Sequence, residues 1–409
     1  MAKSTGRTVV ERMKPAGIPS FDVDPFSTAY FDDPYPVQQE LREAGPVVWL
    51  SRYDICAVAR YEHVRSTLLD WQTFSSARGV GLSDFAKEAP WRPKSIVLEA
   101  DPPLHDRTRR VLTKVLSAAA MSKLRARFES EANALIDGLI ERHNIDLVAD
   151  LAQAYPLAVF PDALGMAREN RRFLLPYGDM VFNAFGPRNA LFESSVANAQ
   201  PVLQWLGEQI QRRALSSHGF GADIYAAADA GMLTSEEAAL VVRSLVTAGV
   251  DTTVNSLSAA LHCLVRFPEQ WQKLRANPSR ARAAFEEAIR FESPVQTFFR
   301  TTTRPTAIAE TPIGEGAKVL TFLGAANRDP RQWRDPERYD IDRPVAGHVG
   351  FGFGIHVCVG QLLARLEGEV LLSALARKVA SIEPTAEPKR RYNNTLRGFA
   401  SMPVALRSS

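Results

Sequence analysis

The chain has 409 residues, of which 45% are hydrophobic and 23% charged, an ordinary composition for a globular protein with a large buried core. A formal net charge of +3 is too small to indicate nucleic-acid binding, although it permits a local basic patch that docks an acidic partner. The three cysteines form no CxxC pair, which argues against a disulfide framework or a structural zinc site and suits a reducing compartment.

The first 20 residues, MAKSTGRTVVERMKPAGIPS, are predicted to form a flexible leader, and residues 21–409 a single domain. The leader contains no apolar core of a signal peptide, and the chain contains no uncharged apolar run of membrane-spanning length. The sequence therefore predicts a soluble, cytoplasmic protein that has no contact with a membrane.

Strand-like and helical segments alternate along the chain in an uneven way. Residues 45–60 (GPVVWLSRYDICAVAR) look like short strands, whereas residues 105–290 carry apolar residues at the three- and four-residue spacing of helices. Proline, glycine and β-branched residues return over 293–350, which indicates short strands and turns, and residues 361–380 form a last strong helix. The predicted fold class is mainly α with a smaller β-containing part, interwoven in one unit.

The longest predicted helix lies in the middle of the chain. Thr234 and Glu237 form a capping-box signature, and the helical pattern then runs unbroken to Arg266. Most of this segment is apolar all round, so we expect a buried central helix. Its middle reads AGVDTT (248–253), where glycine and back-bonding threonine hydroxyls favour a bend, and where a buried carboxylate requires a partner or a function.

One cysteine lies in an unusual neighbourhood, HVGFGFGIHVCVG (348–360). Gly352 and Gly354 favour a tight loop, and the helix that follows Cys358 presents its positive end to the sulfur. Gly360 leaves room for a large flat group. Such a site is what an iron porphyrin with a sulfur axial ligand requires. The alternatives are an inert buried cysteine and a nucleophilic cysteine with His356 as its base, as in a hydrolase without haem.

The segment FGFGIHVCVG resembles the haem-binding signature of the cytochrome P-450 family, the haem-thiolate monooxygenases. Further segments are similar to family motifs in the same order along the chain: DPPLHDRTRR (101–110), AGVDTT (248–253), EAIR (287–290) and DPERYD (335–340). The resemblance implies the cytochrome P-450 fold, with the long central helix over a haem b. It also implies activation of O2 with electrons from NAD(P)H, delivered through a ferredoxin reductase and a ferredoxin of the [2Fe-2S] or another type.

The resemblance assigns roles to individual residues. Cys358 is the expected iron ligand, and Asp251 and Thr252 are the expected catalytic pair that relays protons to bound oxygen. The expected haem contacts are His105, Arg109, Gly249, Arg300, Phe351 and His356. The expected structural triad is Glu287, Arg290 and Arg338, and the ferredoxin is expected to dock near Cys358, where Arg365 and other basic residues gather.

The substrate is expected to lie along one face of the central helix. Ser244 precedes Thr252 by about 12 Å along a helix axis, roughly the span of one substituted aromatic ring. The segment 78–103 brings Arg92 and Ser95 as carboxylate binders. The other expected contacts are Leu98, Phe182, Phe185, Thr247, Val295 and Phe298.

These segments resemble the bacterial subfamily that oxidises para-substituted benzoates and removes the methyl group of 4-methoxybenzoate. The predicted function is therefore hydroxylation or O-demethylation of a small aromatic carboxylic acid by a monomeric enzyme. The alternatives are a monooxygenase of another small hydrophobic substrate, such as a terpenoid or fatty acid, and a non-enzymatic haem-binding sensor.

Overall fold

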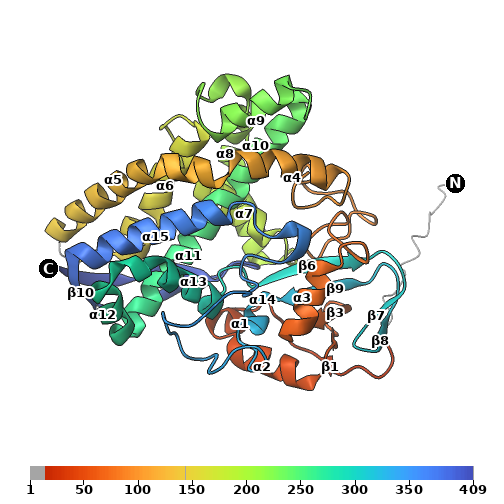
Figure 1. Cartoon of the computed structure of the whole chain (residues 1–409). Coiled ribbons are helices and arrows are strands. Elements are labelled where there is room, and N and C mark those ends of the chain that lie inside the picture. Colours follow the sequence, from red (N-terminus) through yellow and green to blue (C-terminus); the bar gives the residue numbers. More distant parts are fainter. Residues whose placement is uncertain (1–13, 143, 409) are drawn as a thin grey trace.

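The computed structural model describes residues 14–142 and 144–408, and Figure 1 shows a helical part beside a smaller sheet part. The largest sheet has the strand order β1-β2-β3-β9-β6-β4. Its strands are β1 (Ser20–Phe21), β2 (Val48–Leu50), β3 (Ile55–Val58), β4 (Phe74–Ser75), β6 (Thr297–Thr302) and β9 (Lys318–Phe322). The predicted strands within 45–60 and 293–350 are thus confirmed, and β3 and β9 pair in parallel although they are far apart in sequence.

Smaller sheets complete the β part. They consist of β5 (Asn144–Asp146), β10 (Val379–Pro384) and β13 (Pro403–Ser408), the hairpin β11 (Lys389–Arg391) and β12 (Gly398–Ser401), and the hairpin β7 (Thr306–Ile308) and β8 (Thr311–Ile313).

Helices form most of the remaining structure. They are α1 (Thr28–Asp32), α2 (Tyr35–Ala44), α3 (Tyr61–Leu69), α4 (Leu104–Val115), α5 (Ala118–Arg142), α6 (Ala154–Leu164), α7 (Leu174–Asn183), α8 (Ala190–Gln209), α9 (Phe220–Asp229), α10 (Ser235–Gly249), α11 (Asp251–Arg266), α12 (Pro268–Ala276), α13 (Ala281–Glu292), α14 (Leu323–Ala326) and α15 (Gln361–Lys378). Short helical turns are η1 (Leu147–Gln153), η2 (Arg171–Phe173), η3 (Arg212–Ala214), η4 (Pro278–Arg280) and η5 (Gly354–His356). The mainly helical region and the last helix are therefore confirmed.

The central helix departs from its prediction in one respect. The capping box is present, because Thr234 Oγ1 accepts from the Glu237 N–H (3.1 Å) and Glu237 Oε2 accepts from the Thr234 N–H (2.9 Å). The predicted unbroken run is wrong, whereas the predicted bend within 248–253 is confirmed: α10 ends at Gly249 and α11 begins at Asp251, with Val250 between them at ψ −67°. The hydroxyl of Thr252 donates to the carbonyl of Ala248 (2.6 Å), so a side chain competes with the backbone for an acceptor at the break.

The predicted leader, residues 1–20, can be compared with the structure only from residue 14 onward. Residues 1–13 lie outside the described residues. Ile18 is buried in an apolar cluster beside the main sheet, and the carbonyl of Pro19 accepts from the Trp49 N–H (2.9 Å). The chain is thus packed onto the domain from about residue 18. Among the described residues, no helix is both long and apolar enough to cross a membrane.

Candidate active site

A cavity lies between the central helix, the segment before α4 and the loop that carries Cys358. It is lined by most of the predicted site residues: Arg92, Ser95, Leu98, Arg109, Phe182, Phe185, Ser244, Thr247, Gly249, Thr252, Val295, Phe298, Arg300, Phe351, His356 and Cys358. Five predicted residues do not line it: His105, Asp251, Glu287, Arg290 and Arg338.

The backbone around Cys358 explains the glycines of its loop. Gly352 and Gly354 adopt φ of +72° and +71°, a region that L side chains rarely enter. A Cβ on Gly354 would also lie 2.5 Å from the carbonyl oxygen of Leu68. At Gly360 the atom nearest to an added Cβ is Sγ of Cys358, at 3.9 Å, so the space beside the sulfur is open. The prediction of a tight glycine-shaped loop is confirmed.

The sulfur of Cys358 lies at the start of α15. Burial raises the pKa of its thiol, whereas the N–H groups of residues 360 and 361 and the nearby Arg109 and Arg365 lower this pKa. The ring of His356 packs against the ring of His105, with centroids 4.6 Å apart. Backbone donors and two guanidinium groups are therefore the groups that stabilise a thiolate here.

Arginine and histidine side chains gather at the Cys358 end of the cavity. Arg109 donates to the carbonyl of Val357 (2.6 Å), and Nε2 of His105 lies 3.0 Å from the carbonyl of Ile355. Arg300 is buried and donates to the carbonyl of Phe299 (2.8 Å), and burial lowers its pKa to about 10. His356 is half-buried, and the loss of solvent around its ring lowers its pKa to about 2; among the described residues its inaccessible Nε2 has no hydrogen-bond partner.

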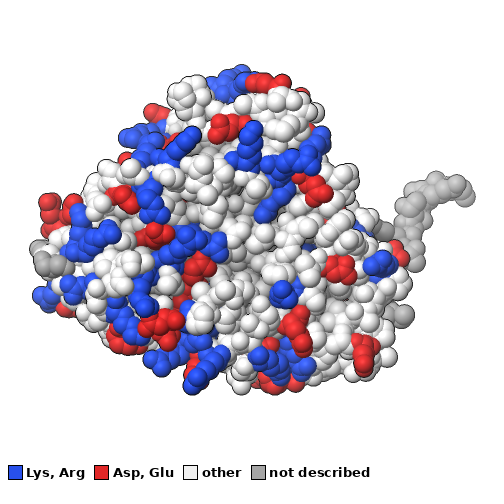
Figure 2. Space-filling view, viewed as in Figure 1, with Lys and Arg blue, Asp and Glu red and all other residues white. Residues whose placement is uncertain are grey.

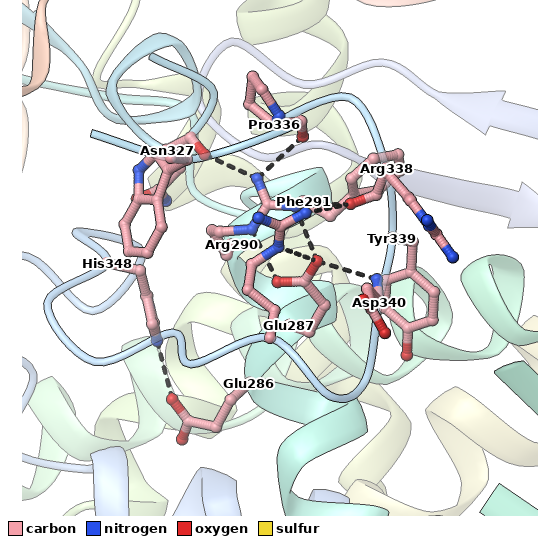
Figure 3. A network of polar contacts seen from close by, with 12 residues as sticks. Glu286, Glu287, Arg290, Phe291, Asn327, Pro336, Arg338, Tyr339, Asp340 and His348 are labelled. Atoms are coloured by element: carbon pink, nitrogen blue, oxygen red, sulfur yellow. Dashed lines mark hydrogen bonds and ion pairs between the residues drawn. The ribbon is translucent and has the colours of Figure 1, made fainter. Parts of the chain in front are cut away.

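A network of buried ion pairs braces the loop before Cys358 (Figure 3). Glu287 and Arg290 on α13 form a bidentate pair, with distances of 2.7 and 2.8 Å. The third predicted member is wrong: Arg338 is exposed and contributes only its carbonyl, which accepts from Arg290 (3.2 Å). The guanidinium that binds Glu287 belongs to Arg343 (3.0 Å), because the chain turns back after Arg338 and carries Arg343 inward.

A second brace lies beside the first in Figure 3. His348 binds Glu286 at 2.8 Å, and Arg365 of α15 also binds Glu286. Burial by itself raises the pKa of Glu286, but the hydrogen bonds from His348 and Arg365 outweigh it and lower this pKa to about 2. The side chain of Arg365 is only 18% exposed, so it serves this brace rather than an open basic surface.

The predicted catalytic pair points in two directions. Thr252 lines the cavity, whereas the carboxylate of Asp251 faces α7 and β11. Oδ2 of Asp251 lies 3.4 Å from Arg391, which also binds Asp179 (2.8 Å). Burial raises the pKa of Asp251 to about 6, and Arg391 partly opposes this shift. The buried carboxylate thus has the partner that the sequence required, and that partner lies outside the cavity.

Polar groups gather at the end of the cavity formed by α10 and the loop over it. The hydroxyl oxygens of Ser95 and Ser244 lie 3.1 Å apart, and Tyr177 and Thr247 share a hydrogen bond of 3.2 Å. Arg92 binds Glu99 with two hydrogen bonds of 3.0 and 3.2 Å.

Arg243 was missed by the sequence reasoning. It lines the cavity and donates to the carbonyls of Pro93 (2.7 Å) and Lys94 (3.1 Å). Its place was open to prediction, because it lies four residues before Thr247 on the same helix face.

Comparisons with known proteins agree with this geometry. The family model described as Cytochrome P450 matches residues 212–405. Cytochrome p450 CYP199A2 of Rhodopseudomonas palustris is 61% identical over 392 residues, which cover 96% of this chain and 95% of that protein.

The chain belongs to the cytochrome P450 family. Cytochrome P450 monooxygenase PikC of Streptomyces venezuelae is 30% identical over 96% of this chain and 95% of its own length. The solved structure of cytochrome P450 CREJ in complex with (4-ethylphenyl) dihydrogen phosphate has a TM-score of 0.85 at 26% identity, and the match covers 94% of this chain and 99% of that one. The predicted fold, enzyme class and cofactor are thereby confirmed: the protein is a haem-thiolate monooxygenase that uses O2, redox partner proteins and a small-molecule substrate. The sensor and hydrolase alternatives are set aside.

The described residues fit a haem. The sulfur of the half-buried Cys358 faces open space, and the buried Nε2 of His356 has no partner within the described residues. Arg109 and Arg300 donate to backbone carbonyls and retain N–H groups for propionate oxygens. When bound, a thiolate-ligated haem supplies the reductive activation of O2. The residues of this chain that would hold it are Cys358, His356, Arg109 and Arg300.

Proposed function

We propose that this enzyme oxidises the para substituent of a small aromatic carboxylic acid such as 4-methoxybenzoate. The supporting observation is the pair of hydroxyls, Ser95 and Ser244, 3.1 Å apart at one end of a cavity whose walls are mainly apolar. Two hydroxyls at this spacing suit the two oxygens of one carboxylate. The ring then lies among the apolar contacts Leu98, Phe182, Phe185, Val295 and Phe298, with its far end toward Cys358.

The charges at the polar end support a monoanion. Arg92 and Arg243 line the cavity, and Glu99 neutralises one of these two charges through Arg92. One positive charge therefore remains to balance one carboxylate, which is costly to bury without a partner. A terpenoid or fatty acid alternative leaves the hydroxyl pair or the aromatic walls without a role.

The comparisons also support this substrate class. CREJ binds (4-ethylphenyl) dihydrogen phosphate, a phenyl ring with an anionic group at one end and an alkyl group opposite to it. The same layout describes 4-methoxybenzoate, with a carboxylate in place of the phosphate.

Thr252 and Asp251 are proposed to carry protons to the site of oxygen activation. Thr252 presents its hydroxyl at the cavity, and Asp251 accepts protons from the side of Arg391, whose side chain is 22% exposed. A carboxyl with a pKa of about 6 exchanges protons readily near neutral pH, which suits a relay.

The electron donor is proposed to be a ferredoxin that docks over the loop of Cys358. Exposed cations lie there on α4, where Arg110 and Lys114 share a surface hollow with Arg109, the residue bound to the Val357 carbonyl. Figure 2 shows Lys and Arg side chains interspersed with acidic ones over this face, so the attraction is local. The expectation that Arg365 joins this surface is replaced, because Arg365 is engaged with Glu286.

We further propose that residues 21–409 act as one monomeric, cytoplasmic domain. Val295 and Phe298 pack against both the main helical core and a cluster beside the sheet, so the two parts share packing. All three cysteines, Cys56, Cys263 and Cys358, are free, as expected in a reducing compartment.

A titration of the resting haem protein tests the substrate proposal. We expect 4-methoxybenzoate to shift the Soret band toward the high-spin form, and methoxybenzene, which lacks the carboxylate, to bind about 10- to 100-fold more weakly. Ser244→Ala should weaken binding of the benzoate and leave methoxybenzene unchanged. Equal affinities of the two ligands would contradict the proposal.

A further inference from the structure

Lys318 is a lysine of β9 with a fully buried side chain. Its Nζ donates to three backbone carbonyls, those of Arg78 (3.3 Å), Gly79 (3.0 Å) and Gly81 (3.0 Å). An ammonium group has three N–H donors, and these three acceptors all belong to one short loop, residues 78–81, more than 230 residues earlier in the chain. A buried charge persists only where polar partners replace water, so this loop and Lys318 stabilise each other.

The loop also carries a carboxylate that balances the charge. Asp84 is buried and binds Arg78 through Nε at 2.9 Å, which closes the segment 78–84 on itself. Burial raises the pKa of Asp84, but hydrogen bonds from Arg78 and the N–H of Ala86 lower it, and the charge of Lys318 adds to this lowering. The ammonium thus has a nearby negative charge as well as three carbonyl dipoles.

The same loop and the adjoining Leu82 contact two walls of the substrate cavity. The N–H of Leu82 donates to the carbonyl of Phe185 (2.8 Å), and the N–H of Phe299 donates to the carbonyl of Val80 (3.0 Å). Gly81 lies so close to the backbone of Phe185 that an added Cβ would be 2.7 Å from its Cα and carbonyl oxygen. Phe185 and Phe298 both line the cavity, with ring centroids 6.0 Å apart.

We propose that Lys318 is a positioning residue for specificity. Its buried ammonium group fixes the loop 78–81 through three hydrogen bonds and thereby sets the spacing of the rings of Phe185 and Phe298. Lys318 does not line the cavity, so it acts on ring-containing ligands only through the loop. The choice of benzoates as natural ligands rests on the proposed function, whereas the positioning of the two rings does not.

The experiment therefore uses ligands that need no assumption about the substrate. The holoenzyme is titrated with imidazole and with 4-phenylimidazole, which both bind the haem iron through nitrogen and shift the Soret band. The ratio of the two dissociation constants reports how well the cavity accepts a ring. We expect Lys318→Met to change this ratio by about 3- to 10-fold with little change for imidazole alone, and Lys318→Arg, which keeps the charge, to restore most of the wild-type ratio.

A second pair of variants keeps the test decisive. The methyl group added by Gly81→Ala displaces the backbone of Phe185. This variant should change the ratio of the two dissociation constants in the same direction as Lys318→Met. Lys94→Met is the matched control, because Lys94 is exposed and donates to the neighbouring carbonyl of Ala77 (3.3 Å), and it should leave the ratio unchanged.

An unchanged ratio in Lys318→Met, with or without a lower melting temperature, would overturn the proposal and leave Lys318 a structural lysine. If Lys318→Met fails to bind haem, an unchanged ratio in Gly81→Ala overturns it instead. A wild-type enzyme that ignores 4-methoxybenzoate refutes the proposed substrate and leaves the imidazole comparison intact.

Discussion

The two ends of the cavity handle positive charge in different ways. At the Cys358 end, Arg109 and Arg300 donate to backbone carbonyls, which leaves their full charge for a ligand. At the polar end, Glu99 binds Arg92 and removes one of two charges. The difference matches the expected ligands, because a haem carries two propionates whereas a benzoate carries one carboxylate. The number of guanidinium groups in a pocket that no carboxylate neutralises therefore indicates the charge of the ligand it holds.

The largest effect is expected at the Cys358 end. Cys358→His should abolish the red-shifted Soret band of the ferrous CO complex, since the thiolate produces this band. His356→Ala is the control: it removes a proposed haem contact and should keep the band while weakening haem retention. A band that survives in Cys358→His would show that another residue binds the iron.

The next effect concerns proton delivery between the two ends. Asp251→Asn should lower the rate of product formation by about 100-fold, because the amide cannot pass on a proton. The pKa of Asp251 is raised to about 6, so its protonated fraction falls above that pH, and the wild-type turnover rate should decline there. A profile of turnover rate against pH that remains unchanged in Asp251→Asn would remove this residue from the relay.

The brace of the Cys358 end is tested by two arginines in the same segment. Arg343→Met removes a guanidinium partner of the buried carboxylate of Glu287 and should lower the free energy of unfolding by about 3 kcal/mol. Arg338→Met removes an exposed side chain and should change it by less than about 0.5 kcal/mol. Denaturant unfolding of the holoenzyme measures both, and the reverse order would restore Arg338 to the triad.

The smallest expected effect is a change in substrate affinity at the polar end of the cavity. Glu99→Gln keeps an oxygen that accepts from the Ser95 N–H but frees the charge of Arg92, so 4-methoxybenzoate should bind about tenfold more tightly. Glu88→Gln, which changes an exposed carboxylate, is the control and should leave the affinity unchanged. Weaker binding in Glu99→Gln would mean that Glu99 positions Arg92 rather than neutralising it.

The features that could be predicted from the sequence are those that depend on local backbone geometry. The loop of Cys358 was predictable because left-handed φ values at Gly352 and Gly354 restrict the residue type, and the capping box at Thr234 because it closes within four residues. The cavity face of the central helix followed from its periodicity, including Ser244 and Thr252.

Long-range partners could not be predicted in this way. Arg343 replaced Arg338 because the path of the chain between them decides which guanidinium turns inward. The pairing of Arg92 with Glu99 and of Asp251 with Arg391 depends on folded geometry, since charge alone offers many partners. The contacts of Lys318 could not be predicted, because its acceptors are backbone carbonyls, which every residue has.

The contact between Asp251 and Arg391 has a consequence for how the reaction is supplied. Under the proposed relay, protons arrive by way of β11, whereas electrons arrive over α4 and the loop of Cys358. The two supplies then use separate surfaces and respond to separate solvent conditions. Added salt should slow electron transfer by screening Arg110 and Lys114, whereas replacing H2O by D2O should slow the proton-dependent step, so the two supplies can be perturbed separately.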